Sequence, residues 1–138
     1  MTLRFQAVLL AALAFGATAC GDDTQVTVPT PIIITEPPFN GTLTVNGAVT
    51  QPFTATSFGT STITLVSLDP NPDSTVKVSM SLGTWNGAAC QIVIANDSAG
   101  AGTVLLGTVS SAGNLCVRMA DPGTLSGPVT FQVTISHP

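Results

Sequence analysis

The chain has 138 residues, of which 7% are charged, and its formal net charge at pH 7 is −4. Three Lys and Arg stand against seven Asp and Glu, so no basic patch is available to hold a nucleic-acid backbone. Ordinary soluble proteins carry about 25% charged residues; this shortage, with abundant Thr, Ser, Gly, Pro and Val, is typical of a β-rich extracellular domain.

Residues 1–19 have the pattern of a secretory signal peptide. Arg4 precedes an apolar stretch from Phe5 to Phe15, and small residues follow it up to Ala19. A basic start, a short apolar core and a small-residue cleavage site are the three parts of such a signal. The apolar stretch is shorter than the ~20 residues that a membrane-spanning helix needs, so we expect this segment to be removed.

Cys20 follows directly, and the arrangement resembles the lipobox of bacterial lipoproteins. The resemblance implies that Cys20 is lipidated and that the mature chain begins there, attached to the membrane by several acyl chains. Ala17 occupies the position where such motifs most often have leucine, and an ordinary signal peptide cut after Ala19 is the alternative. Gly21 in place of aspartate favours, by the same resemblance, the outer membrane over the inner membrane.

Residues 20–38 are expected to form the lipidated N-terminus and an extended Thr- and Pro-rich tether, and residues 39–138 a single domain. The apolar triplet Ile32–Ile34 interrupts the tether. It predicts either a short strand that docks on the edge of the domain or an exposed patch that pairs with a neighbouring molecule. Docking on the edge of the domain is the interpretation we favour.

The domain alternates between apolar and polar residues many times, as half-buried strands do. Asn46–Gly47 predicts a β-hairpin turn, and the punctuated turn from Asp69 to Asp73 separates two later strands. About eight short strands predict an antiparallel β-sandwich, jelly-roll-like or immunoglobulin-like. The expected strands are Thr42–Val45, a return strand carrying Phe53, Ala55 and Phe58, Gly59–Leu68, Val76–Leu82, Cys90–Ala95, Thr103–Val109, Asn114–Met119 and Val129–Ser136.

The closing strand has the clearest pattern. Val129, Phe131, Val133 and Ile135 recur every two residues and are separated by polar residues. On a pleated strand these four side chains share one face. The pattern predicts that this face points into the core.

Five segments together resemble the bacterial pre-peptidase C-terminal domain: Gly41–Leu43, Phe53–Ala55, Gly59–Leu68, the glycine-led strand from Ala112 to Arg118, and Gly127–Val133. The resemblance covers about residues 40–137. It implies a β-sandwich of the kind usually appended to secreted peptidases and other exported enzymes. This chain carries no peptidase, and its cysteines and its loop from Gly83 to Gly87 are not general features of that family.

Cys90 and Cys116 are the two cysteines that remain once Cys20 is assigned to lipid. An exported chain with two such residues predicts one disulfide bond. Together with His137 they do not make a zinc-binding set, so we expect no metal site at the cysteines. Trp85, five residues before Cys90, is expected to pack beside the bridge; the alternative is an exposed side chain that contacts a ligand such as a sugar.

Catalytic groups are scarce. His137 lies next to the last residue, where we expect a solvated tail rather than part of a catalytic triad. Asp69, Asp73, Asp97 and Asp121 fall in predicted turns, and turn chemistry accounts for them. The cluster from Asp69 to Asp73 also offers oxygen ligands for calcium, although a plain turn explains the same residues. We expect no catalysis and no cofactor.

These observations predict a lipid-anchored, surface or periplasmic, non-catalytic binding or structural domain that acts through contacts with an envelope protein or a polysaccharide. The alternative is an accessory subunit that tethers or assists an exported hydrolase or an envelope complex. Its edge strands or the Ile32–Ile34 segment would make that contact.

Replacing Cys20 with alanine is expected to release the protein from membranes, because the acyl chains are the only anchor that the sequence predicts. Fractionation of cells that express the variant checks this, with mass spectrometry of the mature N-terminus as a second measurement. A variant that still sediments with membranes, or a native N-terminus at another residue, would contradict lipidation.

Overall fold

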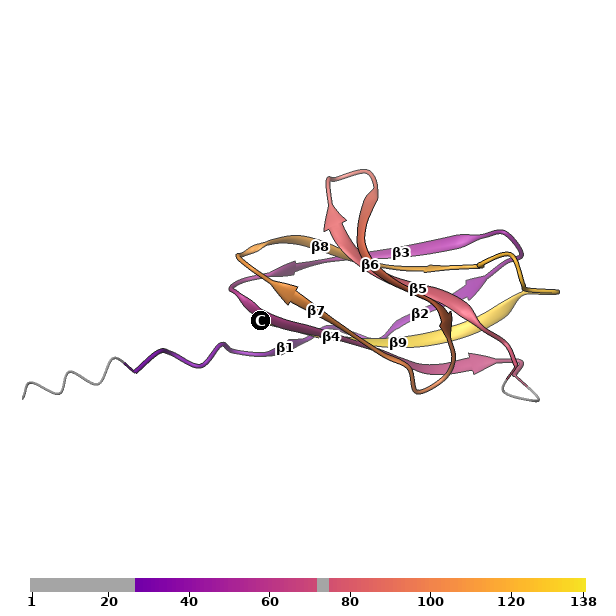
Figure 1. Ribbon diagram of the computed structural model, residues 1–138, viewed down its shortest axis with the longest axis horizontal. Coiled ribbons are helices and arrows are strands. Elements are labelled where there is room, and N and C mark those ends of the chain that lie inside the picture. Colours follow the sequence, from indigo (N-terminus) through magenta and orange to yellow (C-terminus); the bar gives the residue numbers. More distant parts are fainter. Residues whose placement is uncertain (1–26, 72–74) are drawn as a thin grey trace, which may run out of the picture.

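The computed structural model describes residues 27–71 and 75–138. The predicted signal peptide, Cys20 and Asp73 lie outside the described residues. The described chain forms nine strands in two antiparallel sheets that face each other as a β-sandwich (Figure 1). The predicted fold class is therefore confirmed.

The strands are short and follow one another closely along the chain. Their bounds are β1 Ile34–Thr35, β2 Phe39–Leu43, β3 Ala48–Ala55, β4 Gly59–Asp69, β5 Val78–Trp85, β6 Cys90–Ala99, β7 Val104–Val109, β8 Gly113–Ala120 and β9 Val129–His137. The first sheet has the order β2–β9–β4–β7, with β1 pairing along the same edge of β9 as β2, and the second has the order β3–β8–β5–β6.

The pairing follows a simple rule. β2 pairs with β9, β3 with β8, β4 with β7 and β5 with β6, all antiparallel. The chain thus runs out and back as one long ribbon whose tip is the β5–β6 hairpin. The β4–β9 and β5–β8 pairs join the turns of this ribbon into two sheets. This is a jelly-roll topology, so the jelly-roll-like variant of the predicted sandwich is the one observed.

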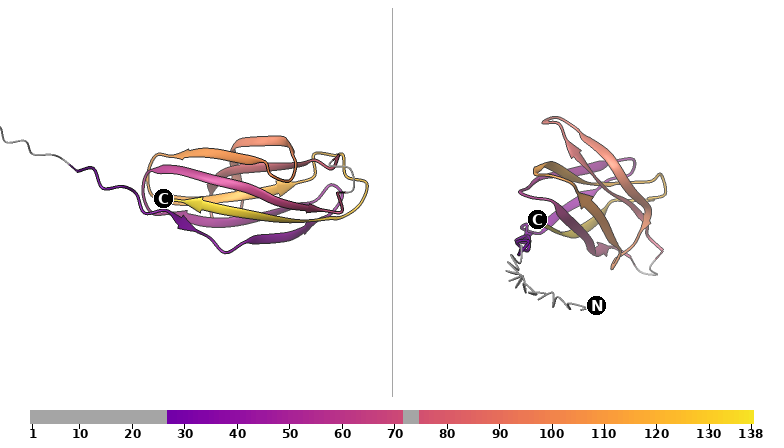
Figure 2. Two further views of the ribbon diagram at one scale, coloured as in Figure 1. Left: turned by 90° about the horizontal axis from the view of Figure 1, so that it is seen from below. Right: turned by 60° about the vertical axis from the view of Figure 1, so that its left-hand side comes forward.

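The core lies between the two sheets, which Figure 2 shows from two further directions. In β9 the side chains of Val129, Phe131, Val133 and Ile135 are all buried, as the alternation predicts. Both sheets contribute to the same cluster. Its other buried members are Phe39, Leu43, Phe53, Ile63, Leu65, Leu68, Val78, Met80, Leu82, Ala99, Val117 and Met119.

The turn at Asn46–Gly47 forms, but the hairpin predicted around it is wrong. Asn46 has φ of 57°, and the N–H of Gly47 donates to the carbonyl oxygen of Thr44 at 2.8 Å. The strands on either side then pair with different partners, β2 with β9 and β3 with β8. The turn is a corner that carries the chain from one sheet to the other.

Asp121 fastens this corner to the connection between β8 and β9. Its Oδ2 accepts the N–H of Asn46 at 2.7 Å, and its Oδ1 accepts three further N–H groups, those of Gly123, Thr124 and Leu125. These donors, Asn46 foremost, lower the pKa of the Asp121 carboxyl although desolvation opposes them. The stability that the carboxylate contributes is present above the usual pKa and is lost as pH falls through the lowered one.

One strand assignment needs correction. Phe58 does not belong to the return strand, which ends at Ala55; the Phe58 side chain is 58% exposed in the connection to β4. The chain reverses there, and Gly59 has φ of 152°. A Cβ at Gly59 would lie 3.0 Å from the ring of Pro138, so this reversal lies against the C-terminus.

Replacing Phe131 with alanine is expected to lower the free energy of unfolding by about 3–5 kcal/mol, through lost burial and an unfilled cavity. The Phe131 ring meets the Phe39 ring edge-on at 5.0 Å, and a Cβ at Gly41 would lie 2.8 Å from its tip. Thr130→Ala on the exposed face of the same strand is the control, and it should cost under ~1 kcal/mol. Denaturant titration measures both, and equal midpoints would contradict the observed register.

Candidate functional site

The tether docks on the domain as predicted. Ile34 pairs with His137 and Thr35 with Ser136, and the N–H of Glu36 donates to the carbonyl oxygen of Ile135 at 2.9 Å. The side chains of the isoleucine triplet nevertheless remain on the surface, with exposed fractions of 81%, 59% and 36% for Ile32, Ile33 and Ile34. The segment is thus docked through its backbone while it presents an apolar patch.

The prediction of a solvated tail at His137 is wrong. The His137 side chain is fully buried, its Nε2 lies 2.9 Å from Glu36 Oε1, and its ring lies 4.8 Å from the ring of Phe53. The following residue is fixed as well, because the carbonyl oxygen of Pro138 accepts the N–H of Thr56 at 2.9 Å. The period-two pattern of β9, continued one step beyond Ile135, would have placed His137 on the core face.

Cys90 and Cys116 form the predicted disulfide, with Cα atoms 5.8 Å apart. They come from β6 and β8, and β5 runs between these two strands. Cys116 lies opposite Gly83, and Cys90 lies opposite Trp85. The start of β6 must therefore bend over β5 to reach β8.

Gly83 makes this crossing feasible. The register of β5 and β6 shifts between Leu82 and Gly83, and a Cβ at Gly83 would collide with the carbonyl group of Gln91 on β6. Only a residue without a side chain leaves room for the β6 backbone at this point. The bridge and the glycine together hold the tip of the β5–β6 hairpin over the outer face of the second sheet.

The hairpin tip is closed by Asn86. Its side-chain oxygen accepts the N–H groups of Ala88 at 2.9 Å and Ala89 at 2.8 Å, and its own N–H donates to the Ala89 carbonyl oxygen. Figure 1 shows this tip standing clear of the two layers. A turn with these bonds holds Trp85 and Cys90 opposite each other at the end of the hairpin.

Trp85 borders a shallow hollow of about 550 Å³ on the outer face of the second sheet. Thr84 pairs with Leu115 and Thr54 pairs with Asn114, so the side chains of Thr54, Asn114 and Trp85 form one row across three strands. The indole is half-buried, next to Cys90. Trp85 therefore lies beside the bridge as predicted, while contact with a ligand stays a prediction. The lining is completed by Pro52, Phe53, Asn86 and Gly87.

The two asparagines of the hollow offer hydrogen-bond donors. Thr54 Oγ1 donates to Asn114 Oδ1 at 3.0 Å, and Asn86 Oδ1 is occupied by the hairpin turn. Each asparagine thus uses its carbonyl oxygen within the protein, which leaves its NH₂ group for an external acceptor. No charged residue lines the hollow, so the site favours a neutral ligand with acceptor oxygens.

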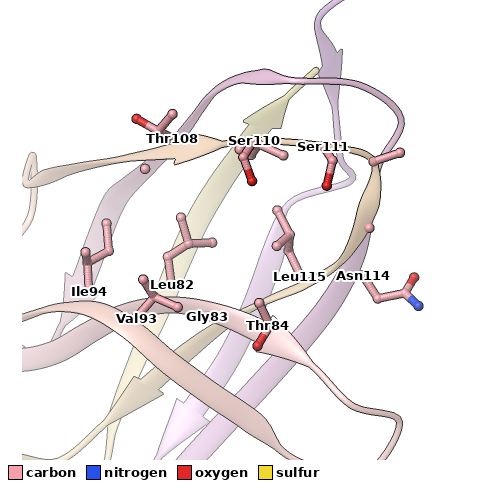
Figure 3. Close-up of a pocket in the computed structure, with 14 residues that line it drawn as sticks. Leu82, Gly83, Thr84, Val93, Ile94, Thr108, Ser110, Ser111, Asn114 and Leu115 are labelled. Atoms are coloured by element: carbon pink, nitrogen blue, oxygen red, sulfur yellow. The ribbon is translucent and has the colours of Figure 1, made fainter.

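A second concavity of about 330 Å³ opens between the sheets, beside the hollow. Figure 3 shows Leu82, Ile94 and Leu115 pointing into it, with Ser110 and Ser111 on the opposite wall. The side chain of Asn114 points away from it. This cleft lies at the edge of the core. Apolar side chains form its base, and hydroxyl groups line its rim.

Asp73 of the acidic turn lies outside the described residues, so calcium binding there stays a prediction. Asp69 ends β4, and Asn71 Oδ1 accepts the N–H of Val76 at 3.3 Å, so that oxygen serves the turn. Within residues 27–71 and 75–138, no three His, Cys, Asp or Glu side chains gather closely enough to hold a metal ion. Asp97 instead accepts the hydroxyl of Ser79 at 2.7 Å.

Comparison with protein-family models, with curated proteins and with solved structures found no match. The resemblance to the pre-peptidase C-terminal domain and to bacterial lipoproteins therefore stays a prediction. The described ranges contain no helix with the length and apolar character needed to cross a membrane.

Gly83→Ala is expected to lower the free energy of unfolding by about 1–3 kcal/mol, because the new methyl group meets backbone that cannot move aside cheaply. It should also raise the fraction of molecules with free thiols after oxidative refolding, since the β6 backbone is pushed away from β8. Thermal unfolding and thiol titration measure the two effects. Gly113→Ala is the matched control, because nothing lies within 4 Å of a Cβ there; equal behaviour of the two variants would refute the crossing.

Proposed function

We propose that this chain is a lipid-anchored, non-catalytic binding domain of the cell envelope that contacts neutral polysaccharide through the Trp85 hollow. The observation that carries the proposal is the row of Thr54, Asn114 and Trp85 beside Asn86. There the indole of Trp85, at the end of the disulfide-linked β5–β6 hairpin, lines one hollow with the amide side chains of Asn86 and of Asn114 on β8.

The chemistry of a neutral sugar matches this arrangement. A pyranose ring has an apolar C–H face that packs on an indole, while the hydroxyl oxygens around its rim accept hydrogen bonds. Asn86 and Asn114 line the same hollow as Trp85, and their NH₂ groups are donors that such oxygens could accept from. One aromatic ring and a few hydrogen bonds support a dissociation constant on the order of 1 mM for a single sugar unit, so useful affinity comes from a repeating polymer.

A second candidate function, the accessory subunit, has its own supporting observation. β6 lies at the free edge of the second sheet, with Ile92 49% and Val93 70% exposed. β3, at the opposite edge of the same sheet, carries Pro52, which blocks further pairing. An apolar edge of this kind, next to the cleft, fits an extended segment of a partner protein.

Saccharide binding is expected to change the fluorescence of Trp85, which is the only tryptophan in a chain without tyrosine. Titration with neutral oligosaccharides measures the affinity in the native protein. Asn114→Ala keeps the reporter and should weaken binding about 3- to 10-fold, the effect of one hydrogen bond. Phe58→Ala, an exposed aromatic outside the hollow, should bind as the native protein does.

The opposite result would be equally clear. If no neutral oligosaccharide alters the emission of Trp85, or if Asn114→Ala and Phe58→Ala bind alike, the hollow is not a saccharide site. The accessory-subunit alternative would then be the better account of the domain.

A further inference from the structure

The hollow and the tether lie at the same end of the sandwich. β3 ends at Ala55, β5 ends at Trp85 and β8 begins at Gly113, so the row that forms the hollow lies at the ends of β3 and β5 and at the start of β8. β9 ends at the same level, and β1 pairs with its final residues. Figures 1 and 2 show the C-terminus beside the point where the tether joins the domain.

A continuous set of contacts connects the two features. Glu36, the first residue after β1, meets His137 at 2.9 Å, the His137 ring packs on Phe53, and Phe53 lines the hollow beside Trp85. The hollow therefore cannot turn independently of the docked tether. The opposite end of the sandwich carries the Asn46 corner and its link to Asp121.

The tether limits how far this end can lie from an anchor at Cys20. Residues 20–33 number 14 and span at most about 50 Å even when fully extended. A hollow at the far end of the sandwich would lie another ~30 Å away, the length of a strand of about ten residues. Because the hollow is at the near end, it can approach the surface that holds the lipid.

We infer that the Trp85 hollow binds neutral sugar headgroups of glycolipids in the same membrane that anchors the chain. The inference rests on the proposed function and adds the source of the ligand. The lipid anchor and the sugar site then contact the same surface. Anchoring confines the protein to that surface and so raises the effective concentration of the glycolipid at the hollow. No charged side chain is needed at the hollow, because the acyl chains supply the attraction to the membrane.

The test uses the mature lipidated protein inserted in phosphatidylcholine vesicles, with Trp85 emission as the readout. Diglucosyl diacylglycerol is placed either in the same vesicles or in separate ones, and a soluble glucose oligosaccharide is titrated in parallel. The emission change is expected at a bulk sugar concentration at least about 10-fold lower when the glycolipid shares the vesicle. Asn114→Ala should need about 3- to 10-fold more glycolipid for the same response, and Phe58→Ala should respond as the native protein does.

A second anchoring point tests the geometry. Thr124 lies at the opposite end of the sandwich and its side chain is exposed. In a Cys20→Ala background, Thr124→Cys is coupled to a maleimide lipid, which turns the hollow away from the bilayer. The response to glycolipid in the same vesicle should then fall to the level seen with separate vesicles.

The outcomes separate this inference from the proposal it rests on. Equal responses from both anchoring points, or to shared and separate glycolipid, overturn the membrane source while the saccharide site stands. An emission shift in vesicles without glycolipid means that Trp85 enters the lipid itself, which also overturns the inference. Absence of any response, including to the free oligosaccharide, removes the saccharide site altogether.

Discussion

The position of β9 between β2 and β4 is the constraint on which the rest of the structure depends. β9 bonds to partners along both edges and buries every second side chain. Those partners come from the first half of the chain, so their pairing sets the reversed order in which the remaining strands meet. The tether strand, the buried C-terminus and the hairpin tip all take their places relative to this one strand.

Local pattern was sufficient for the strands and for the core face, because alternation and burial are properties of single segments. The local pattern did not determine which strands pair with each other. The Asn46–Gly47 signal describes a turn correctly but says nothing about whether the flanking strands pair with each other. His137 was misplaced for a related reason, since a terminal position argues for exposure while the strand pattern, carried one step further, argues for burial.

The residues of the candidate site likewise include some that a local pattern predicts and some that it does not. The disulfide and its neighbour Trp85 could be predicted, because two cysteines in a chain with a predicted export signal and a short spacing were sufficient evidence. Asn114 and Thr54 could not, since they reach Trp85 only through the register of three strands that are far apart in sequence. Gly83 is similar: its need to be glycine arises from the Gln91 backbone crossing above it, which no local motif records.

The strand pairs are nested one inside another along the chain, and this has a consequence for the order of folding. A chain that emerges N-terminus first makes β2, β3 and β4 long before their partners β9, β8 and β7 exist. Only the β5–β6 hairpin can form from neighbouring residues, and every later pair closes a larger loop around it, with the growing entropic cost that slows folding of such topologies. The first sheet cannot be completed until His137 has emerged. The topology therefore predicts that the chain becomes compact late, once the strands that complete both sheets are present.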